Sequence, residues 1–173
     1  MSGMETWKYR WPDVVVFLAC FLAQVAFVPL WGGVRLDLVL AVAVAVGMRQ
    51  GPQAGGLTGL IGGLLLDLVR GRFIGAFALT HAVVGYMAGV AQAKLFENSL
   101  YLPFLFSFAG TVISELGFWA LSAIWGTSLP LPAGMLALIG KEAFWNGLVS
   151  PFLYRLVRAR LPAQPVGIGG RAL

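Results

Sequence analysis

The feature that most constrains this chain is a series of long apolar runs separated by short polar breaks. A helix needs about 20 apolar residues to cross a hydrocarbon core of roughly 30 Å. The chain is 59% hydrophobic and 11% charged, whereas soluble domains carry about 25% charged residues. We therefore predict an all-α integral membrane protein, a bundle of six transmembrane helices. The predicted spans lie at about 13–31, 35–48, 51–69, 74–94, 102–126 and 133–157.

These spans form a single membrane domain, residues 13–158, because no linker is long enough to separate a second one. A short cytoplasmic N-terminus at 1–12 and a flexible cytoplasmic tail at 159–173 flank it. The second span is short and meets the third at Gly47–Pro52, where glycine and proline favour a tight turn. If that span is re-entrant, five spans remain and the termini lie on opposite faces.

The basic residues predict the orientation. With six spans, most of the 12 Lys and Arg residues lie on the side of the termini, and only Arg35, Arg70 and Arg72 lie in the opposite loops. An excess of Lys and Arg marks the cytoplasmic side, so both termini are expected inside a bacterial inner membrane. The net charge of +5 then reflects topology and anionic headgroups. It does not indicate nucleic-acid binding, because the basic residues are scattered at helix ends.

The sequence does not favour a signal peptide at the first apolar run, nor a disulfide or a metal site at the cysteine. The first apolar run follows Lys8 and Arg10 like a signal peptide, but more hydrophobic helices follow it in place of a cleavage site and a polar mature protein. The chain has one cysteine, Cys20, which excludes an intramolecular disulfide and a thiolate metal cluster. We expect this cysteine to be a small buried apolar residue.

Glycines recur every four residues along the third span, so one face of that helix is almost bare backbone. The fourth span carries a matching stripe of Ala and Gly. Because lipid provides no hydrophobic drive for helix pairing, close van der Waals contact across such faces must supply it. We expect tight pairing of these two spans, although spacing leaves open whether the partner is the neighbouring helix or another protein. The ladder is Gly51, Gly55, Gly59 and Gly63, and the stripe is Ala78, Ala82, Gly85, Gly89 and Ala93.

Two ionisable residues lie on these packed faces. Asp67 continues the ladder from Gly63 and is predicted to point into the packing, where a charge needs a partner. It either offsets Arg70 or Arg72 at the interface or has a specific structural or partner-binding role. His81 shares the face of Gly85 and is expected to be a hydrogen-bonded core histidine, since no metal-ligand pattern surrounds it.

The last two spans both carry a polar face. Polar residues at spacings of three and four cluster on span five, and span six answers with acidic and amide side chains four apart. The depths of Glu115, Lys141, Glu142 and Asn146 allow an ion pair or hydrogen-bonded cluster that holds the helices together or lines a cavity. No nucleophile, phosphate-cradling loop or metal-ligand group accompanies them, so we expect no catalytic residues, no metal site and no cofactor. Transport of a small molecule is the principal alternative. The span-five residues are Ser107, Thr111, Ser114, Glu115 and Ser122, and Ser150 completes span six.

Several short motifs resemble the rod shape-determining protein MreD family. They are Leu36-Asp37-Leu38-Val39-Leu40, Gly59-Leu60-Ile61-Gly62-Gly63-Leu64-Leu65-Leu66-Asp67, Gly75, and Gly85-Tyr86-Met87-Ala88-Gly89. The resemblance covers about residues 12–158, and outside these motifs it is mostly hydropathy. It implies structural or docking positions at Gly63, Asp67, Gly75, Gly85, Tyr86 and Gly89.

What the resemblance implies about function is a non-enzymatic component of the bacterial cell-elongation machinery that organises peptidoglycan synthesis. Its direct partner would be an MreC-like single-span scaffold protein, with membrane lipid around it. Through the scaffold it would connect indirectly to the MreB filament, to RodA and to its transpeptidase. The family is also similar in helix arrangement to the substrate-binding subunits of vitamin transporters, which keeps a substrate-binding or transport subunit as the alternative.

Overall fold

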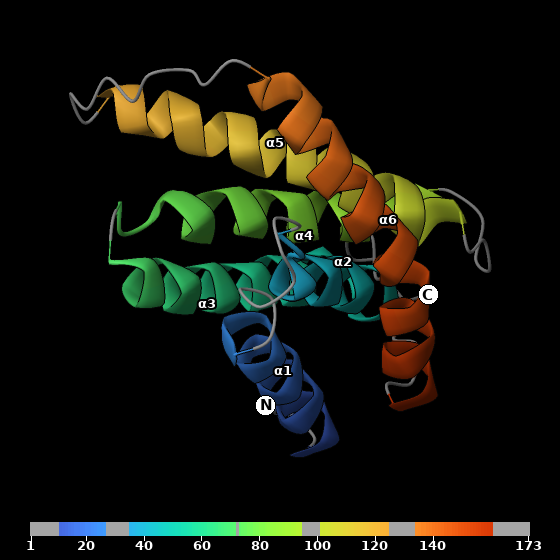
Figure 1. Cartoon of the computed structure of the whole chain (residues 1–173). Coiled ribbons are helices and arrows are strands. Elements are labelled where there is room, and N and C mark those ends of the chain that lie inside the picture. Colours follow the sequence, from blue (N-terminus) through green and yellow to red (C-terminus); the bar gives the residue numbers. More distant parts are fainter. Residues whose placement is uncertain (1–10, 27–34, 72, 95–100, 125–133, 161–173) are drawn as a thin grey trace, which may run out of the picture.

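The computed structural model describes residues 11–26, 35–71, 73–94, 101–124 and 134–160, and this part of the chain is entirely helical (Figure 1). One helix forms in each of the six apolar runs, which confirms the all-α, six-helix prediction. The predicted terminal segments, 1–12 and 159–173, lie almost wholly outside the described residues. The helices are α1 Trp11–Ala26, α2 Leu38–Gln50, α3 Pro52–Arg70, α4 Ala76–Lys94, α5 Tyr101–Ile124 and α6 Met135–Arg160.

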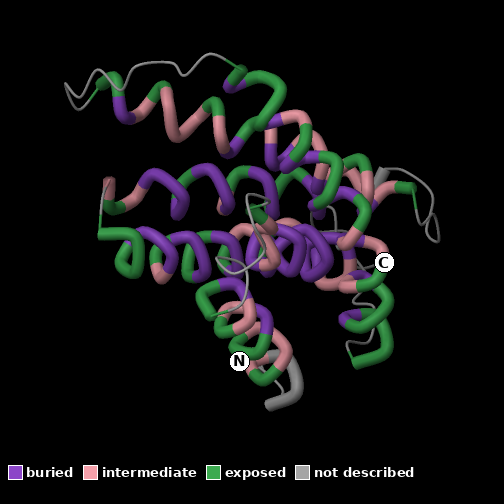
Figure 2. The backbone as a smooth tube through the Cα atoms, viewed as in Figure 1, coloured by how far each residue is buried: buried purple, intermediate pink, exposed green. Residues whose placement is uncertain are grey.

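The short helix α2 forms the centre of the bundle. Every residue from Val39 to Met48 is buried, and α2 packs against each of the other five helices. Figure 2 shows it as a nearly continuous purple tube. A helix that is apolar on all sides is expected to be surrounded in this way. Its 13 residues rise about 20 Å, about two thirds of a hydrocarbon core of roughly 30 Å, so α2 corresponds to the short second span of the prediction.

Helices α3 and α4 form a tight antiparallel hairpin, the most extensive helix pair in the described fold. The chain leaves α3 through Gly71, whose φ of 63° is left-handed and whose N–H bonds to the carbonyl of Asp67. It enters α4 after Gly75, whose φ is 102°. Glycine adopts such angles without the Cβ clash that other residues meet, so these two positions permit the short connection.

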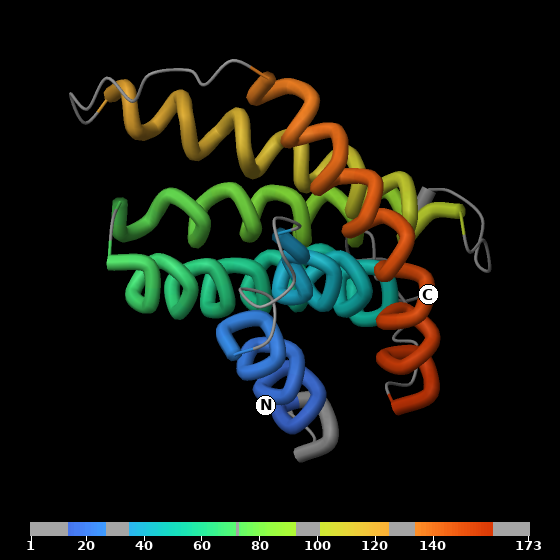
Figure 3. The backbone as a smooth tube through the Cα atoms, viewed as in Figure 1, coloured from blue at the N-terminus to red at the C-terminus, as the bar shows by residue number. Residues whose placement is uncertain are grey.

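The remaining helices build on that hairpin in a fixed order. Figure 3 shows α3, α4 and α5 stacked one above the next, with α6 crossing α5 and reaching α2. Helix α1 packs mainly on α2 and less on α6. Helices α4, α5 and α6 all contact α2, and polar side chains of α4 and α6 meet at its N-terminus.

The distribution of polarity is the reverse of that in a water-soluble bundle. Helix α3 exposes an apolar stripe and buries its glycines together with Thr58 and Asp67. Helix α6 exposes large apolar side chains and buries Glu142, Asn146 and Ser150. A helix on the surface of a soluble domain buries its apolar stripe and exposes its polar side. The exposed residues are Leu57, Leu60, Ile61, Leu64 and Leu68 on α3, and Phe144, Trp145, Leu148, Phe152 and Leu156 on α6.

By length and composition, two helices in the described part of the chain are suited to crossing a membrane, α3 and α5. The apolar parts of α1, α2 and α4 are shorter than 18 residues. Helix α6 has 26 residues, but Lys141, Glu142 and several arginines interrupt its apolar character. The other four predicted spans and the orientation of the termini remain predictions.

Candidate functional site

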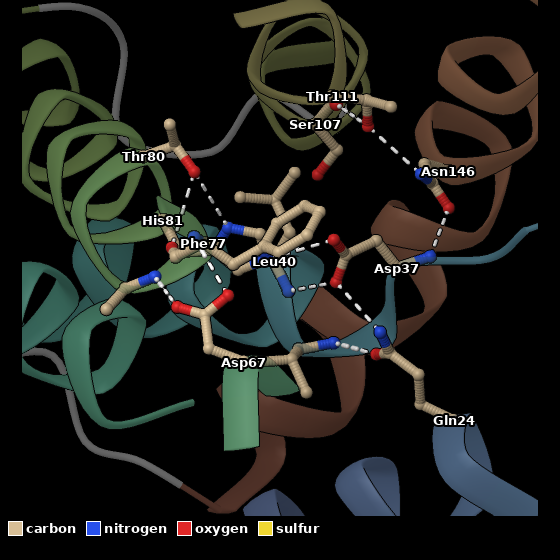
Figure 4. Close-up of polar contacts among 12 residues, drawn as sticks. Gln24, Asp37, Leu40, Asp67, Phe77, Thr80, His81, Ser107, Thr111 and Asn146 are labelled. Carbon is tan, nitrogen blue, oxygen red and sulfur yellow. Dashed lines mark hydrogen bonds and ion pairs between the residues drawn. The ribbon is translucent and has the colours of Figure 1, made fainter. Parts of the chain in front are cut away.

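Asp37 is the hub of a buried polar network that joins four helices (Figure 4). It is the N-cap residue of α2, and its Oδ1 accepts the backbone N–H of Leu40 at 3.0 Å. Aspartate is favoured at this position because the first N–H groups of a helix have no partner within it. The same oxygen accepts from Nε2 of Gln24 at 3.3 Å. The cap therefore also ties α2 to α1.

Gln24 and Asn146 complete the N-terminus of α2 from opposite sides. The Oε1 of Gln24 on α1 accepts the backbone N–H of Val39 at 2.9 Å. The Oδ1 of Asn146 on α6 accepts the backbone N–H of Asp37 at 2.8 Å. Both side chains are buried, where an unpaired amide would be costly. Three side chains from three different parts of the chain thus satisfy the start of α2.

His81 connects the hub to α4. It is fully buried, and its Nε2 lies 2.9 Å from Oδ2 of Asp37. Because the carboxylate oxygen accepts, Nε2 carries the hydrogen, and Nδ1 faces the hydroxyl of Thr80 at 3.5 Å. Thr80 donates to the carbonyl of Ala76 at 3.0 Å. The prediction of a hydrogen-bonded core histidine is confirmed.

Asp67 lies at the end of the glycine ladder and is 2% exposed. Its carboxylate accepts the backbone N–H groups of Gly75, Phe77 and Ala78, at 2.9, 3.2 and 3.1 Å. It therefore caps the start of α4 from the end of α3, where the positive end of the helix dipole also favours an anion. The guanidinium of Arg70 instead lies 4.2 Å above the ring of Phe77. Asp67 thus has a specific structural role, as the cap of α4, and no ion pair joins it to Arg70 in the described part of the chain.

The glycine ladder lies inside the fold, at a seam between α3, α4 and α2. A Cβ at Gly59 would fall on the carbonyl of His81, and one at Gly63 would reach the Cα of Ala78 at 2.6 Å. Gly55 and Gly85 contact each other's backbone in the same way. Real Cβ atoms are not found within 3.0 Å of such atoms. We name these glycines, with Gly47, Gly51 and Gly89, the glycine seam, which is closed to any other protein.

Besides Asp67, two of the residues singled out by the resemblance lie outside this seam. Tyr86 is 50% exposed on the outer side of α4. Gly75 lies in the hairpin turn, and a Cβ there would meet no atom within 4 Å. Its positive φ accounts for the glycine, and its backbone N–H donates to Asp67. Of the six residues that the resemblance singles out, Tyr86 is the one with an exposed side chain; within the longer motifs Leu60, Ile61, Leu64 and Met87 are exposed as well.

Helices α5 and α6 are joined by successive polar rungs. The hydroxyl of Ser107 donates to that of Ser150 at 2.7 Å, and Nδ2 of Asn146 donates to Oγ1 of Thr111 at 3.0 Å. From the first pair to the second, the residue number increases by four on α5 and decreases by four on α6, as expected for antiparallel helices. The next rung should pair Ser114 and Glu115 with Glu142. Two of the three rungs are closed by direct hydrogen bonds.

The predicted cluster of Glu115, Lys141, Glu142 and Asn146 forms only in part. Glu142 and Asn146 are buried between the helices, and Glu115 is partly buried. Lys141, by contrast, is exposed, and no ion pair joins it to either glutamate among the described contacts. Consecutive residues of a helix point about 100° apart, and here Glu142 is buried against α5 whereas Lys141 is exposed. The expected Lys141 ion pair is therefore wrong.

The third rung contains two buried polar atoms without a hydrogen-bond partner, Oγ of Ser114 and Oε1 of Glu142. Their residues are 1% and 3% exposed. Buried polar groups are paired in the great majority of cases. Elsewhere in the network, the buried polar atoms of the described side chains have hydrogen-bond partners. The third rung is therefore the part of this site that could bind a ligand.

Sequence reasoning did not single out Gln24 or Asp37 as site residues. The available signal for Asp37 was its position directly before an apolar helix, the pattern of an N-cap. Among the described residues, no group of three or more His, Cys, Asp or Glu side chains is arranged to hold a metal ion. The network holds four helices in register and leaves one acidic rung unpaired. No family model, no curated protein and no solved structure matches this chain.

Proposed function

We propose that this protein is a non-enzymatic, multi-pass component of the bacterial inner membrane with both termini in the cytoplasm, serving the cell-elongation machinery as an MreD-like protein. The observation that supports a membrane setting is the reversed polarity of α3 and α6, which expose leucines and aromatics and bury acids and amides. Contiguous apolar surfaces of this extent are rare on soluble monomers. Lipid would cover them without cost.

A binding role follows from the way the internal groups are used. The network around Asp37 and Asp67 is occupied with capping helices, and the glycine seam is filled by the protein's own backbone. The surface left for a partner is the outer apolar face. Tyr86, half exposed on α4 and part of the motif that resembles the MreD family, is our proposed docking residue. The partner that binds this outer face is the membrane helix of an MreC-like single-span scaffold protein.

The wider connections are proposed through that scaffold. The MreB filament, RodA and its transpeptidase would be reached indirectly, so that the protein influences where peptidoglycan is made. Membrane lipid is the other partner, and the proposal involves no nucleic acid and no cofactor. The scattered basic residues fit anionic headgroups better than a nucleic-acid backbone.

The test is co-purification of the full chain with a tagged MreC-like scaffold after co-expression in membranes. We expect the wild type to be retained, and Tyr86→Ala to weaken retention while its Tm in detergent stays unchanged. Leu136→Ala, which also truncates an exposed apolar side chain, at a site 79% exposed on α6, is the control. A chain that is monodisperse alone and ignores the scaffold would contradict the proposal.

A substrate-binding or transport subunit is the second candidate, and the unpaired Glu142 is the observation that favours it. Such a subunit should be stabilised by its ligand through mass action, by about 2.7 kcal/mol at a hundredfold excess over Kd. A screen of small molecules by thermal shift separates the two candidates. A stabilising ligand, together with no retention by the scaffold, would favour transport.

A further inference from the structure

The third rung between α5 and α6 differs from the two below it in its charge. The first rung pairs two hydroxyls and the second pairs an amide with a hydroxyl. The third contains the buried, unpaired hydroxyl of Ser114 and the buried carboxylate of Glu142, and the carboxylate of Glu115 is near enough to act on that of Glu142 electrostatically. Because Ser114 lies seven residues from Ser107 and three from Thr111, it occupies the same buried face of α5. Its hydroxyl therefore points into the interface that contains Glu142.

Among the described residues, no cationic group forms an ion pair with this rung. The charged groups that act on both glutamates across space are Asp37, Arg35 and Arg70. The acids thus outnumber the arginines, and neither arginine forms an ion pair with a glutamate among the described residues. His81 is already bonded to Asp37. A buried carboxylate without a counter-charge or a hydrogen-bond donor is strongly unfavourable.

We propose that Ser114, Glu115 and Glu142 form a binding site for one small monovalent cation such as Na⁺. The donors are all oxygens, namely the carboxylate of Glu142, the hydroxyl of Ser114 and the carboxylate of Glu115. Such a set suits a hard cation and offers nothing to a soft metal. The described residues contain no third metal-ligating carboxylate, histidine or cysteine to complete a multivalent cage. This site goes beyond the proposed function and does not depend on the scaffold.

The experiment uses the purified full chain in detergent, in choline chloride that is replaced stepwise by NaCl at constant ionic strength. We expect Tm to rise saturably, by about 3–6 °C for a cation held at ten times its Kd. Trp145, three residues from Glu142 on α6, gives a second readout through its fluorescence. Both signals should saturate at the same Na⁺ concentration.

The variants identify the site. Glu142→Gln keeps the size of the side chain and removes its charge, and it should abolish the response to Na⁺. Ser114→Ala removes one oxygen and should weaken binding at least threefold, which keeps the test valid if Glu142→Gln fails to fold. Lys141→Gln is the matched control, because it changes the adjacent exposed charge, and it should bind Na⁺ at least as well as the wild type.

Three results would overturn the proposal. One is a wild-type protein equally stable in choline and in Na⁺ across pH 5–9, which would assign a neutral, protonated Glu142. Another is a Na⁺ response that survives in Glu142→Gln. The third is a loss of stability in Arg35→Gln combined with no effect of Na⁺ on the wild type, which would assign the counter-charge to Arg35. Retention by the scaffold is measured separately, so failure of this site and failure of the proposed function are distinguishable.

Discussion

Two glycine-to-alanine changes in helix interiors should have opposite effects on stability. Gly59 lies in the glycine seam, and a Cβ there would lie 2.5 Å from the carbonyl carbon of His81 and 2.9 Å from the backbone nitrogen of Ala82. Gly140 lies inside α6, and a Cβ there would meet nothing within 4 Å. The chemical change is identical, so the comparison isolates the close approach of α3 and α4.

The expected magnitudes follow from these contacts. Alanine stabilises a helix interior by about 1 kcal/mol relative to glycine, and Gly140→Ala should show this gain. At Gly59 the obstacles are backbone atoms, which move only if the whole helix moves. Carbon atoms rest at about 3.5–4.0 Å, so α3 and α4 must separate by roughly 1 Å. Overpacking of this kind costs about 1–3 kcal/mol, which leaves Gly59→Ala about 0–2 kcal/mol less stable than the wild type and about 1–3 kcal/mol less stable than Gly140→Ala.

The assay is reversible unfolding of both variants in the same detergent, followed by helical circular dichroism. Gly59→Leu, with a much larger side chain, should prevent the native fold and lower the yield of monodisperse protein. If Gly59→Ala were as stable as Gly140→Ala, the described proximity of α3 and α4 would be refuted. Equal destabilisation of both variants would instead attribute the loss to the helix backbone and not to the seam.

Three further predictions concern the polar network. Asp37→Ala removes the α2 cap and leaves His81 unpaired, so it should lower the free energy of unfolding by about 3 kcal/mol. Asp37→Asn retains one acceptor oxygen and should lose less than half of that free energy. Equal losses would contradict the capping role. Asp67→Ala should speed amide hydrogen exchange at the start of α4 while leaving α5 and α6 unchanged, and uniform acceleration would argue against a local cap. A double-mutant cycle on Ser107→Ala and Ser150→Ala should give a coupling of about 0.5–1.5 kcal/mol, and additivity would contradict their hydrogen bond.

The helices and the glycine seam were predictable because their signals are local. Six apolar runs give six helices, and a spacing of four places Gly55, Gly59 and Gly63 on one face whatever surrounds it. The same periodicity placed Asp67 inside the fold. Its role as the cap of α4 was not predictable, since it depends on the hairpin turn bringing the N–H groups of Gly75, Phe77 and Ala78 back to it.

The hub around Asp37 could not be assembled from the sequence. Its partners Gln24, His81 and Asn146 lie 13, 44 and 109 residues away, and only the packing of α1, α4 and α6 around α2 brings them together. Lys141 illustrates a second limit. Its depth along α6 matched that of the glutamates, but depth does not fix the direction in which a helical side chain points, and packing against α5 selected Glu142.

The burial of α2 has a consequence for biosynthesis. This helix is among the first parts of the chain to be made, yet α4, α5 and α6, which enclose it, and Asn146, which holds its first turn, are made later. Until those segments emerge, Asp37 lacks the hydrogen bonds of its side chain to His81 and of its backbone N–H to Asn146. Helix α2, the centre of the bundle, is therefore synthesised early but surrounded by its partners late. Truncation after α4 should leave α2 without a stable position, and an insertase or chaperone that holds α1 to α3 during translation would act at this stage.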